Sequence, residues 1–428
     1  MKLAMIPLLI VASCFSATGE IRMTVEVDAT ELPRKLLHTR MVIPVTGDTL
    51  SLWYPKWIPG IHGPRGPIEN LAGLRVETPD GESVSWRRDN AERFLFHIAP
   101  PDGVSEVVVR LDYLCSQPSV NSRGIDSYGN SLLGVINWNT CLLYPDGYNT
   151  QDIAVDLTLT LPDGWKQASA LPEKSTDGAT TTFETFSFHD VVDSPLITGP
   201  HMRTINISSD NLPPVYWHIT SESPGALNID EELIEKYKNM VAEAGELFGG
   251  AHFDEYHLLL FLSDDFPNTG LEHLRSSLNG LGERDLEDQD KVDGWAGYLI
   301  PHEFAHSWCG KYRRPAGMAT PDFHTDKHTN LLWVYEGLDQ YLGEVLCVRA
   351  GVWSMDTYME TLALKLSTLM HQRGRQWRSL EDTAVDAYHL RGGVPAWGNW
   401  RRGQDYYNEG LLLWLEADAI IRAKTDND

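Results

Sequence analysis

Two histidines and a glutamate stand at a spacing that suits a divalent metal ion. In the run His302-Glu303-Phe304-Ala305-His306 the histidines are four residues apart, so on a helix both imidazoles share one face. Imidazole suits Zn²⁺, which lowers the pKa of its water to about 7. Glu303 is expected to take a proton from that water and pass it to a leaving group. The alternative is a pair of solvated histidines and an exposed Glu, but the apolar neighbours favour a buried helix.

A catalytic zinc needs a third protein ligand and one open position. One known arrangement has Gly three and His six residues after the second His, but Cys309 and Tyr312 stand there. The other arrangement takes a Glu from a later helix, and Glu336 opens a segment with helical apolar spacing 30 residues after His306. A first-turn Glu stabilised by the helix dipole is the alternative. We expect His302, His306 and Glu336 to hold one zinc per chain.

The N-terminal half of the chain predicts β-structure. Between residues 20 and about 210, short runs of strand formers are separated by Pro-Asp-Gly turns, and residues 153–161 alternate apolar and polar side chains. This is the period of half-buried strands. We expect an antiparallel N-terminal β domain over residues 20–215.

The C-terminal half predicts helices. Residues 230–248 have helical apolar spacing, with Asp230 as N-cap and Gly249-Gly250 as the stop, and a buried strand is expected at residues 256–262. An irregular stretch at 312–330 interrupts the helical pattern that follows. We expect a mainly helical domain over residues 216–428 that carries the metal site. The helical pattern continues almost to residue 428, which suggests truncation of this domain.

Length and charge limit the possible functions. The 428 residues exceed one ordinary core and favour two or three domains. The chain has 35 Lys and Arg against 60 Asp and Glu, a net charge of −25. So acidic a chain repels phosphate backbones, which argues against nucleic-acid binding. No later segment is long and apolar enough for a membrane helix.

The first 19 residues are expected to be an export signal. Lys2 precedes ten residues, Leu3–Ala12, that form an apolar run too short to span a bilayer. The run ends in Val11-Ala12-Ser13-Cys14, which is similar to a bacterial lipobox; cleavage near Ala17–Gly19 is the alternative. We expect a periplasmic or envelope-associated protein, attached to a membrane only through a lipid on Cys14. Export permits disulfides, and pairing of Cys115 with Cys141 is left open.

Several motifs together resemble a known family. The zinc motif, Lys311-Tyr312-Arg313-Arg314-Pro315 and Leu331–Gly337 are similar to segments of the glycyl aminopeptidase family of gluzincins, relatives of aminopeptidase N. Thr269–His273, Ser379–Thr383, Asp405–Gly410 and Trp57–Gly60 are similar to further family segments, in order along the chain. The resemblance implies a thermolysin-like, mainly helical catalytic domain after the β domain.

The resemblance also implies roles for single residues. Glu272 would bind the free α-amino group of a peptide, and Gly270 of the same segment would bind the substrate. Tyr407, rather than its neighbour Tyr406, would donate its hydroxyl to the oxyanion. The implied activity is removal of the first residue of peptides, with a preference for small residues such as Gly or Ala. Family members usually also carry a PDZ domain.

Some positions depart from the family pattern, and other functions stay open. Thr269, Cys309, Gly310, Asn408 and Glu409 replace the usual residues, which puts substrate preference in question but removes no ligand. A zinc endopeptidase with the same site is one alternative. A catalytically silent binding module is the other.

Further residues are candidate partners of the site. Asp339 and Gln340 are candidates for orienting the imidazoles. His324 and His328, four residues apart in a polar loop, are weak candidates for a second metal. His62 is interpreted as structural.

Overall fold

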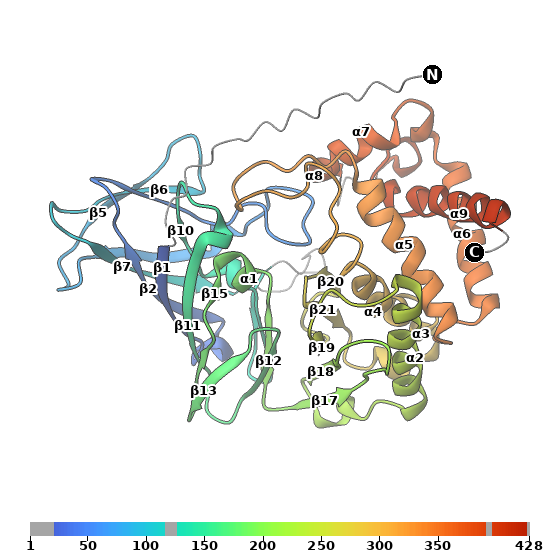
Figure 1. Cartoon of the computed structure of the whole chain (residues 1–428), viewed down its shortest axis with the longest axis horizontal. Coiled ribbons are helices and arrows are strands. Elements are labelled where there is room, and N and C mark those ends of the chain that lie inside the picture. Colours follow the sequence, from blue (N-terminus) through green and yellow to red (C-terminus); the bar gives the residue numbers. More distant parts are fainter. Residues whose placement is uncertain (1–20, 116–125, 391–395, 426–428) are drawn as a thin grey trace, which may run out of the picture.

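The computed structural model describes residues 21–115, 126–390 and 396–425. The expected export segment and Cys14 lie outside the described residues. A β-rich N-terminal part and a helical C-terminal part lie side by side in Figure 1, as the predicted fold class requires. Within the described residues, no helix is both long and apolar enough to cross a bilayer.

The largest sheet of the N-terminal part follows directly from alternating side chains. In β1 (Ile21–Asp28) every second residue is buried, so the strand lays one apolar face on the core. The strand order is β13-β14-β11-β1-β2-β7-β4, with β15 beside β11. Most pairings are antiparallel, as expected, but β1 and β11 run parallel, because no hairpin joins them. The other bounds are β2 Leu36–Pro44, β4 Leu71–Glu77, β7 Glu106–Leu114, β11 Ile153–Thr160, β13 Glu173–Asp177, β14 Thr180–Phe183 and β15 Phe186–Ser187.

Two four-stranded sheets complete the N-terminal part. One has the order β10-β3-β6-β5 and the other β12-β16-β9-β8. Their bounds are β3 Leu50–Trp53, β5 Ser85–Arg88, β6 Leu95–Ala99, β8 Tyr128–Gly129, β9 Gly134–Ile136, β10 Tyr144–Pro145, β12 Lys166–Ser169 and β16 Leu196–Gly199. Cys115 and Cys141 are buried free thiols in this part, so the structure contains no bridge between them.

A five-stranded sheet begins the C-terminal part. Its order is β17-β18-β19-β21-β20, with bounds β17 Met202–Asn206, β18 Val215–Ser221, β19 Tyr256–Leu262, β20 Thr269–Glu272 and β21 Ser276–Leu281. The predicted strand at 256–262 is confirmed as β19. Its Leu258, Leu260 and Leu262 pack against helices, whereas Leu259 and Phe261 pack against the sheet of β8, β9, β12 and β16. Because both faces are covered, the strand is apolar from Leu258 to Leu262.

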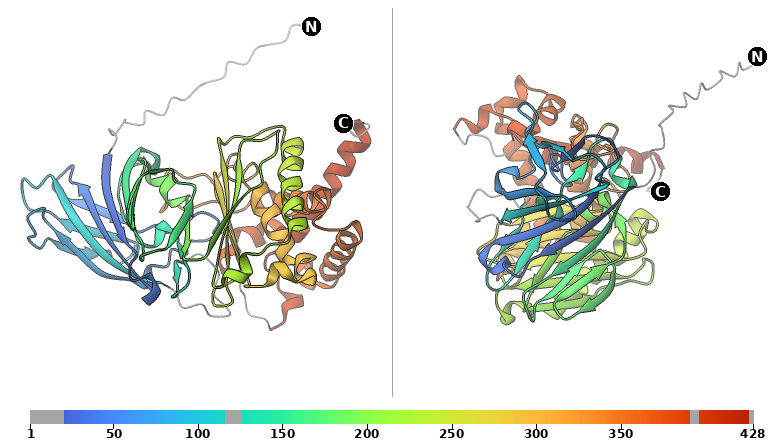
Figure 2. Two further views of the ribbon diagram at one scale, coloured as in Figure 1. Left: turned by 90° about the horizontal axis from the view of Figure 1, so that it is seen from below. Right: turned by 90° about the vertical axis from the view of Figure 1, so that its left-hand side faces the viewer.

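Helices cover one side of this sheet, as the left view in Figure 2 shows. The bounds are α1 Phe188–Val192, α2 Glu231–Phe248, α3 Gln289–Val292, α4 Trp295–Ala305, α5 Leu332–Arg349, α6 Met355–His371, α7 Leu380–Val385, α8 Ala387–Leu390 and α9 Asp405–Thr425. The predicted ends of α2 are confirmed: Asp230 accepts a hydrogen bond from the N–H of Glu232, and Gly249 takes the left-handed conformation at φ 71°.

Candidate active site

Helix α4 places the first two candidate ligands. Its side chains are buried on nearly all sides, between the five-stranded sheet and α5, which is why the segment is apolar all round. His302 is 5% exposed and His306 is 1% exposed. Their Nε2 atoms lie 3.2 Å apart, so the four-residue spacing brings both imidazoles to one point, as predicted.

Helix α5 brings the third candidate to the same point. Glu336 is buried, and its Oε2 lies 3.2 Å from His306 Nε2 and 3.6 Å from His302 Nε2. These atoms suit a single tetrahedral ion, because ligand bonds of about 2.0–2.1 Å place neighbouring donors about 3.3 Å apart. Glu336 Oε2 makes no hydrogen bond to any described residue. A buried carboxylate oxygen facing two imidazole nitrogens fits a cation at their centre.

Outer partners hold the ligands in place. Tyr298 Oη lies 2.5 Å from His302 Nδ1. Asp339 Oδ2 lies 2.9 Å from His306 Nδ1, which confirms Asp339 as a partner of an imidazole. Burial raises the pKa of Asp339 to about 7. Gln340 instead donates a hydrogen bond of 3.1 Å to Glu344, so the prediction that it orients an imidazole is wrong.

His62 reaches the site from the N-terminal part. Its Nε2 contacts Glu336 Oε1, and both side chains are almost fully buried. The other carboxylate oxygen of Glu336 is thus free to face the two imidazoles. His62 was expected to be structural, and no spacing rule connects two residues 274 positions apart.

Glu303 lies beside the ligands with one buried oxygen, Oε2, that has no hydrogen-bond partner among the described residues. Burial and the nearby Glu272 carboxylate raise its pKa well above the usual value. Gly270 in β20 provides the space, because a Cβ at this position would lie 2.0 Å from Glu303 Oε1. A carboxyl group held in this way suits proton transfer.

Glu272 ends strand β20 close to the same centre. Its side chain is buried, and its Oε1 accepts a hydrogen bond of 2.5 Å from Tyr335. One carboxylate oxygen each from Glu272 and Glu303 lies within 4.8 Å of a ring nitrogen of His306. A second anionic group therefore stands next to the candidate ligands rather than on an outer edge of the sheet.

Helix α9 brings Tyr407 to the site by close packing on α5. Gly337 and Gly410 face one another, since a Cβ on Gly337 would lie 2.7 Å from the Gly410 Cα. The Tyr407 hydroxyl lies 3.5 Å from His62 Nε2, and its ring centroid is 6.3 Å from that of His302. Tyr406 is fully buried in a small apolar cluster. Tyr407 lines the open cavity beside His302 and Glu303, whereas Tyr406 does not.

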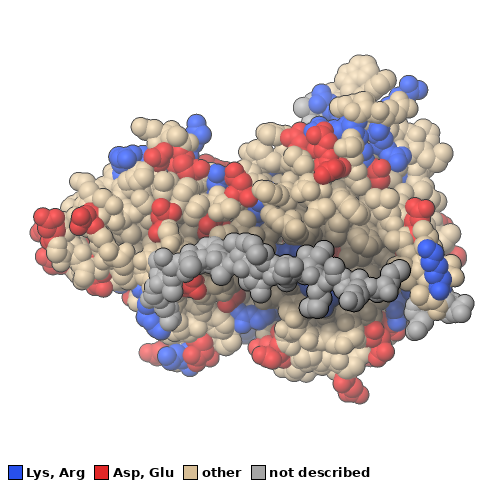
Figure 3. Space-filling model, turned by 45° about the horizontal axis from the view of Figure 1, so that its top comes forward, with Lys and Arg blue, Asp and Glu red and all other residues tan. Residues whose placement is uncertain are grey.

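Two cavities border this centre, and Figure 3 shows a hollow between the two parts of the molecule. One is open and is lined by residues that include Thr269, Gly270, His302, Glu303 and Tyr407. The other lies beyond Glu272 and Tyr335, and its volume of about 30 Å³ leaves room for about two waters. In the described parts of the chain, three-ligand groups of metal-binding type occur only at this centre. His324 instead stacks on Trp53 with 4.1 Å between ring centroids.

Two family models and several solved structures match the chain. The Peptidase M61 N-terminal domain matches residues 24–200, and the M61 glycyl aminopeptidase matches residues 296–413. No curated protein sequence matches.

Structural likeness agrees with these matches. An aminopeptidase N family protein from Idiomarina loihiensis superposes with a TM-score of 0.78 at 21% identity, over 95% of this chain and 68% of that one. Yeast LTA4 hydrolase, in complex with bestatin, superposes with a TM-score of 0.53 at 12% identity, over 94% of this chain and 59% of that one. The native yeast enzyme gives the same TM-score at 13% identity. At such identities the likeness shows the fold. Because the two family models lie in order and together span more than half of the chain, the chain belongs to the M61 glycyl aminopeptidase family of peptidases.

Proposed function

We propose that the protein is a zinc aminopeptidase that hydrolyses the first peptide bond of peptides. His302, His306 and Glu336 would hold one zinc ion, in keeping with the 3.2–3.6 Å separations of their donor atoms. Bound there, zinc supplies Lewis-acid chemistry that polarises the scissile carbonyl and makes water a better nucleophile near neutral pH.

Side chains of the protein transfer the proton and stabilise the negative charge that develops during hydrolysis. Glu303 accepts a proton from the attacking water and returns it to the leaving amine, a role that its raised pKa suits. Tyr407, at the open cavity, donates its hydroxyl to the developing oxyanion.

Glu272 carries the assignment as an aminopeptidase. Its buried carboxylate stands within 4.8 Å of His306, where it pairs with the α-ammonium group of a substrate. The small cavity beyond it supports a limit on the length of the first side chain, which admits first residues such as Gly and Ala.

The test compares a peptide with a free amine and the same peptide acetylated, using zinc-loaded protein and its Glu303→Gln variant. We expect about one zinc per chain, cleavage of the free-amine peptide alone, and a loss of at least about 10²-fold in the variant. Equal rates on both peptides would make the protein an endopeptidase. Absence of zinc together with absence of cleavage would favour a binding module.

A further inference from the structure

The small cavity beyond Glu272 is lined by three cationic side chains. Lys311, Arg314 and Lys327 all face it, together with Glu272 and Asp322. This is unexpected in a chain of net charge −25. A cluster of positive charges in one cavity of an acidic protein suits the binding of an anionic group there.

Two of the three cations form no ion pair with any described residue. Lys311 Nζ lies 2.6 Å from Asp193 Oδ1 and is paired. Arg314 and Lys327 make neither a hydrogen bond nor an ion pair through their side chains to any residue in the described ranges. Glu272 is the carboxylate that the proposed function assigns to the substrate amine.

Asp322 forms no ion pair with Arg314 or Lys327 either. Its Oδ1 accepts hydrogen bonds from the N–H groups of His324 and Thr325, and its Oδ2 accepts one from the Thr325 hydroxyl. This carboxylate is therefore engaged with its own loop.

The unpaired charge is held at an electrostatic cost. Burial, then Arg314 and Lys311, lowers the pKa of Lys327 to about 7. A bound carboxylate would remove this cost, since a partly buried cation is stable only when it is paired.

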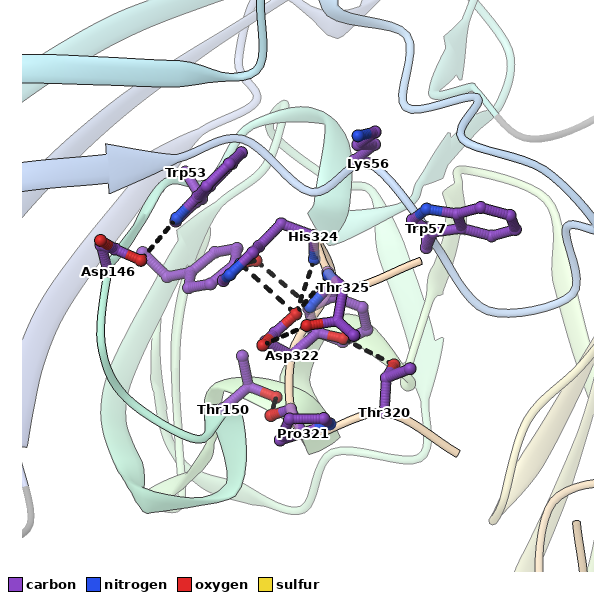
Figure 4. Close-up of polar contacts among 12 residues, drawn as sticks. Trp53, Lys56, Trp57, Asp146, Thr150, Thr320, Pro321, Asp322, His324 and Thr325 are labelled. Carbon is purple, nitrogen blue, oxygen red and sulfur yellow. Dashed lines mark hydrogen bonds and ion pairs between the residues drawn. The ribbon is translucent and has the colours of Figure 1, made fainter. Parts of the chain in front are cut away.

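The loop that carries these cations is fixed to the N-terminal part, so the cavity is preformed (Figure 4). Pro321 O accepts hydrogen bonds from the Thr150 N–H at 2.9 Å and the Thr150 hydroxyl at 3.1 Å. Phe323 O accepts hydrogen bonds from the N–H groups of Lys56 and Trp57. His324 stacks on Trp53. Such anchoring reduces the entropic cost of binding a ligand between Arg314 and Lys327.

We propose that this cavity binds the side-chain carboxylate of an acidic first residue, so that peptides beginning with Asp are preferred substrates. The inference rests on the proposed function, because Glu272 lines the same cavity and would hold the amine. In Asp the amine and the side-chain carboxylate stand on neighbouring carbons, so one residue can reach Glu272 and the cations together. Space for about two waters suits a CH₂–COO⁻ group better than longer side chains.

The test measures kcat/KM of the zinc-loaded protein on three peptides that differ only in the first residue: Asp, Asn or Ala. Asn matches Asp in shape but has no charge. We expect Asp to exceed Asn by about 10- to 100-fold, the range of hydrogen bonds to charged groups. Arg314→Gln and Lys327→Gln are expected to bring this ratio toward one. Arg313→Gln is the matched control, since Arg313 is exposed and does not line the cavity.

The outcomes separate this inference from the proposed function. Cleavage of the Ala and Asn peptides with no preference for Asp would overturn the acidic-residue inference and leave the aminopeptidase standing. If no free-amine peptide is cleaved, the proposed function fails. The acidic-residue inference is then tested by the binding of free amino acids to the cavity. In that case free L-aspartate should raise the Tm more than L-asparagine does, and Lys327→Gln should abolish the difference. Equal shifts would refute the anion site.

Discussion

Replacement of Gly270 by Ala tests whether Glu303 is positioned by the backbone of β20. The new Cβ would lie 2.0 Å from Glu303 Oε1 and 2.6 Å from Leu299 Cδ1. Ordinary contact begins near 3.4 Å, so the carboxylate must move by about 1.4 Å. A misplacement of about 1 Å in a catalytic group costs on the order of 10²-fold in rate.

We therefore expect Gly270→Ala to lower kcat by at least about 10²-fold. Overpacking is expected to cost about 1–3 kcal/mol of the free energy of unfolding, so the protein should still fold. Zinc content should stay at that of the unmodified protein, because none of the candidate ligands is among the atoms nearest the new methyl group.

A double-mutant cycle with Glu303→Gln makes the assay specific. If Gly270 acts through Glu303, then Gly270→Ala should cost less than about tenfold once Glu303 is already Gln. Gly47→Ala is the control, since a Cβ there meets only the Thr49 carbonyl oxygen at 4.0 Å. Full activity of Gly270→Ala, or equal losses in both backgrounds, would refute the positioning argument.

Two more predictions concern residues around the candidate metal site. His62→Phe should lower zinc affinity by about 10- to 100-fold, because Glu336 Oε1 loses its partner. Competition with a chelating dye measures the zinc affinity. The control is His371→Phe, which changes an exposed histidine and should bind zinc normally. The folded-state pKa of Lys327 is about 7, below the ~10.4 of an unfolded Lys. Folding therefore releases a proton between these two pH values. As a result, the stability of the unmodified protein rises with pH over this range. Lys327→Gln should thus be more stable than the unmodified protein below pH 7, and this advantage should be lost above about pH 10. Thermal unfolding of both proteins across this pH range measures the difference in stability. A stability difference that does not change with pH would contradict the assigned pKa.

Local patterns predicted the elements that carry the candidate ligands. The spacing of His302 and His306 specifies one helix face, and the apolar run at 256–262 specifies a strand covered on both sides. Both predictions depend only on periodicity within a few turns or residues. The parallel pairing of β1 with β11 was not predicted, because strand alternation contains no information on which strands pair.

The candidate motif could therefore be recognised in the sequence, because its residues are neighbours on helices. His302 and Glu303 lie in the last turn of α4 and His306 is its C-cap, whereas Glu336 lies near the start of α5, which begins at Leu332.

The surroundings of the motif were decided by tertiary structure alone. His62 meets Glu336 only because the β-rich part packs against α5. Lys327 and Arg314 form one cationic cavity only because their irregular loop is anchored on Trp53 and Thr150. Contacts between distant segments are set by the packing of whole domains, on which the local period of a sequence carries no information.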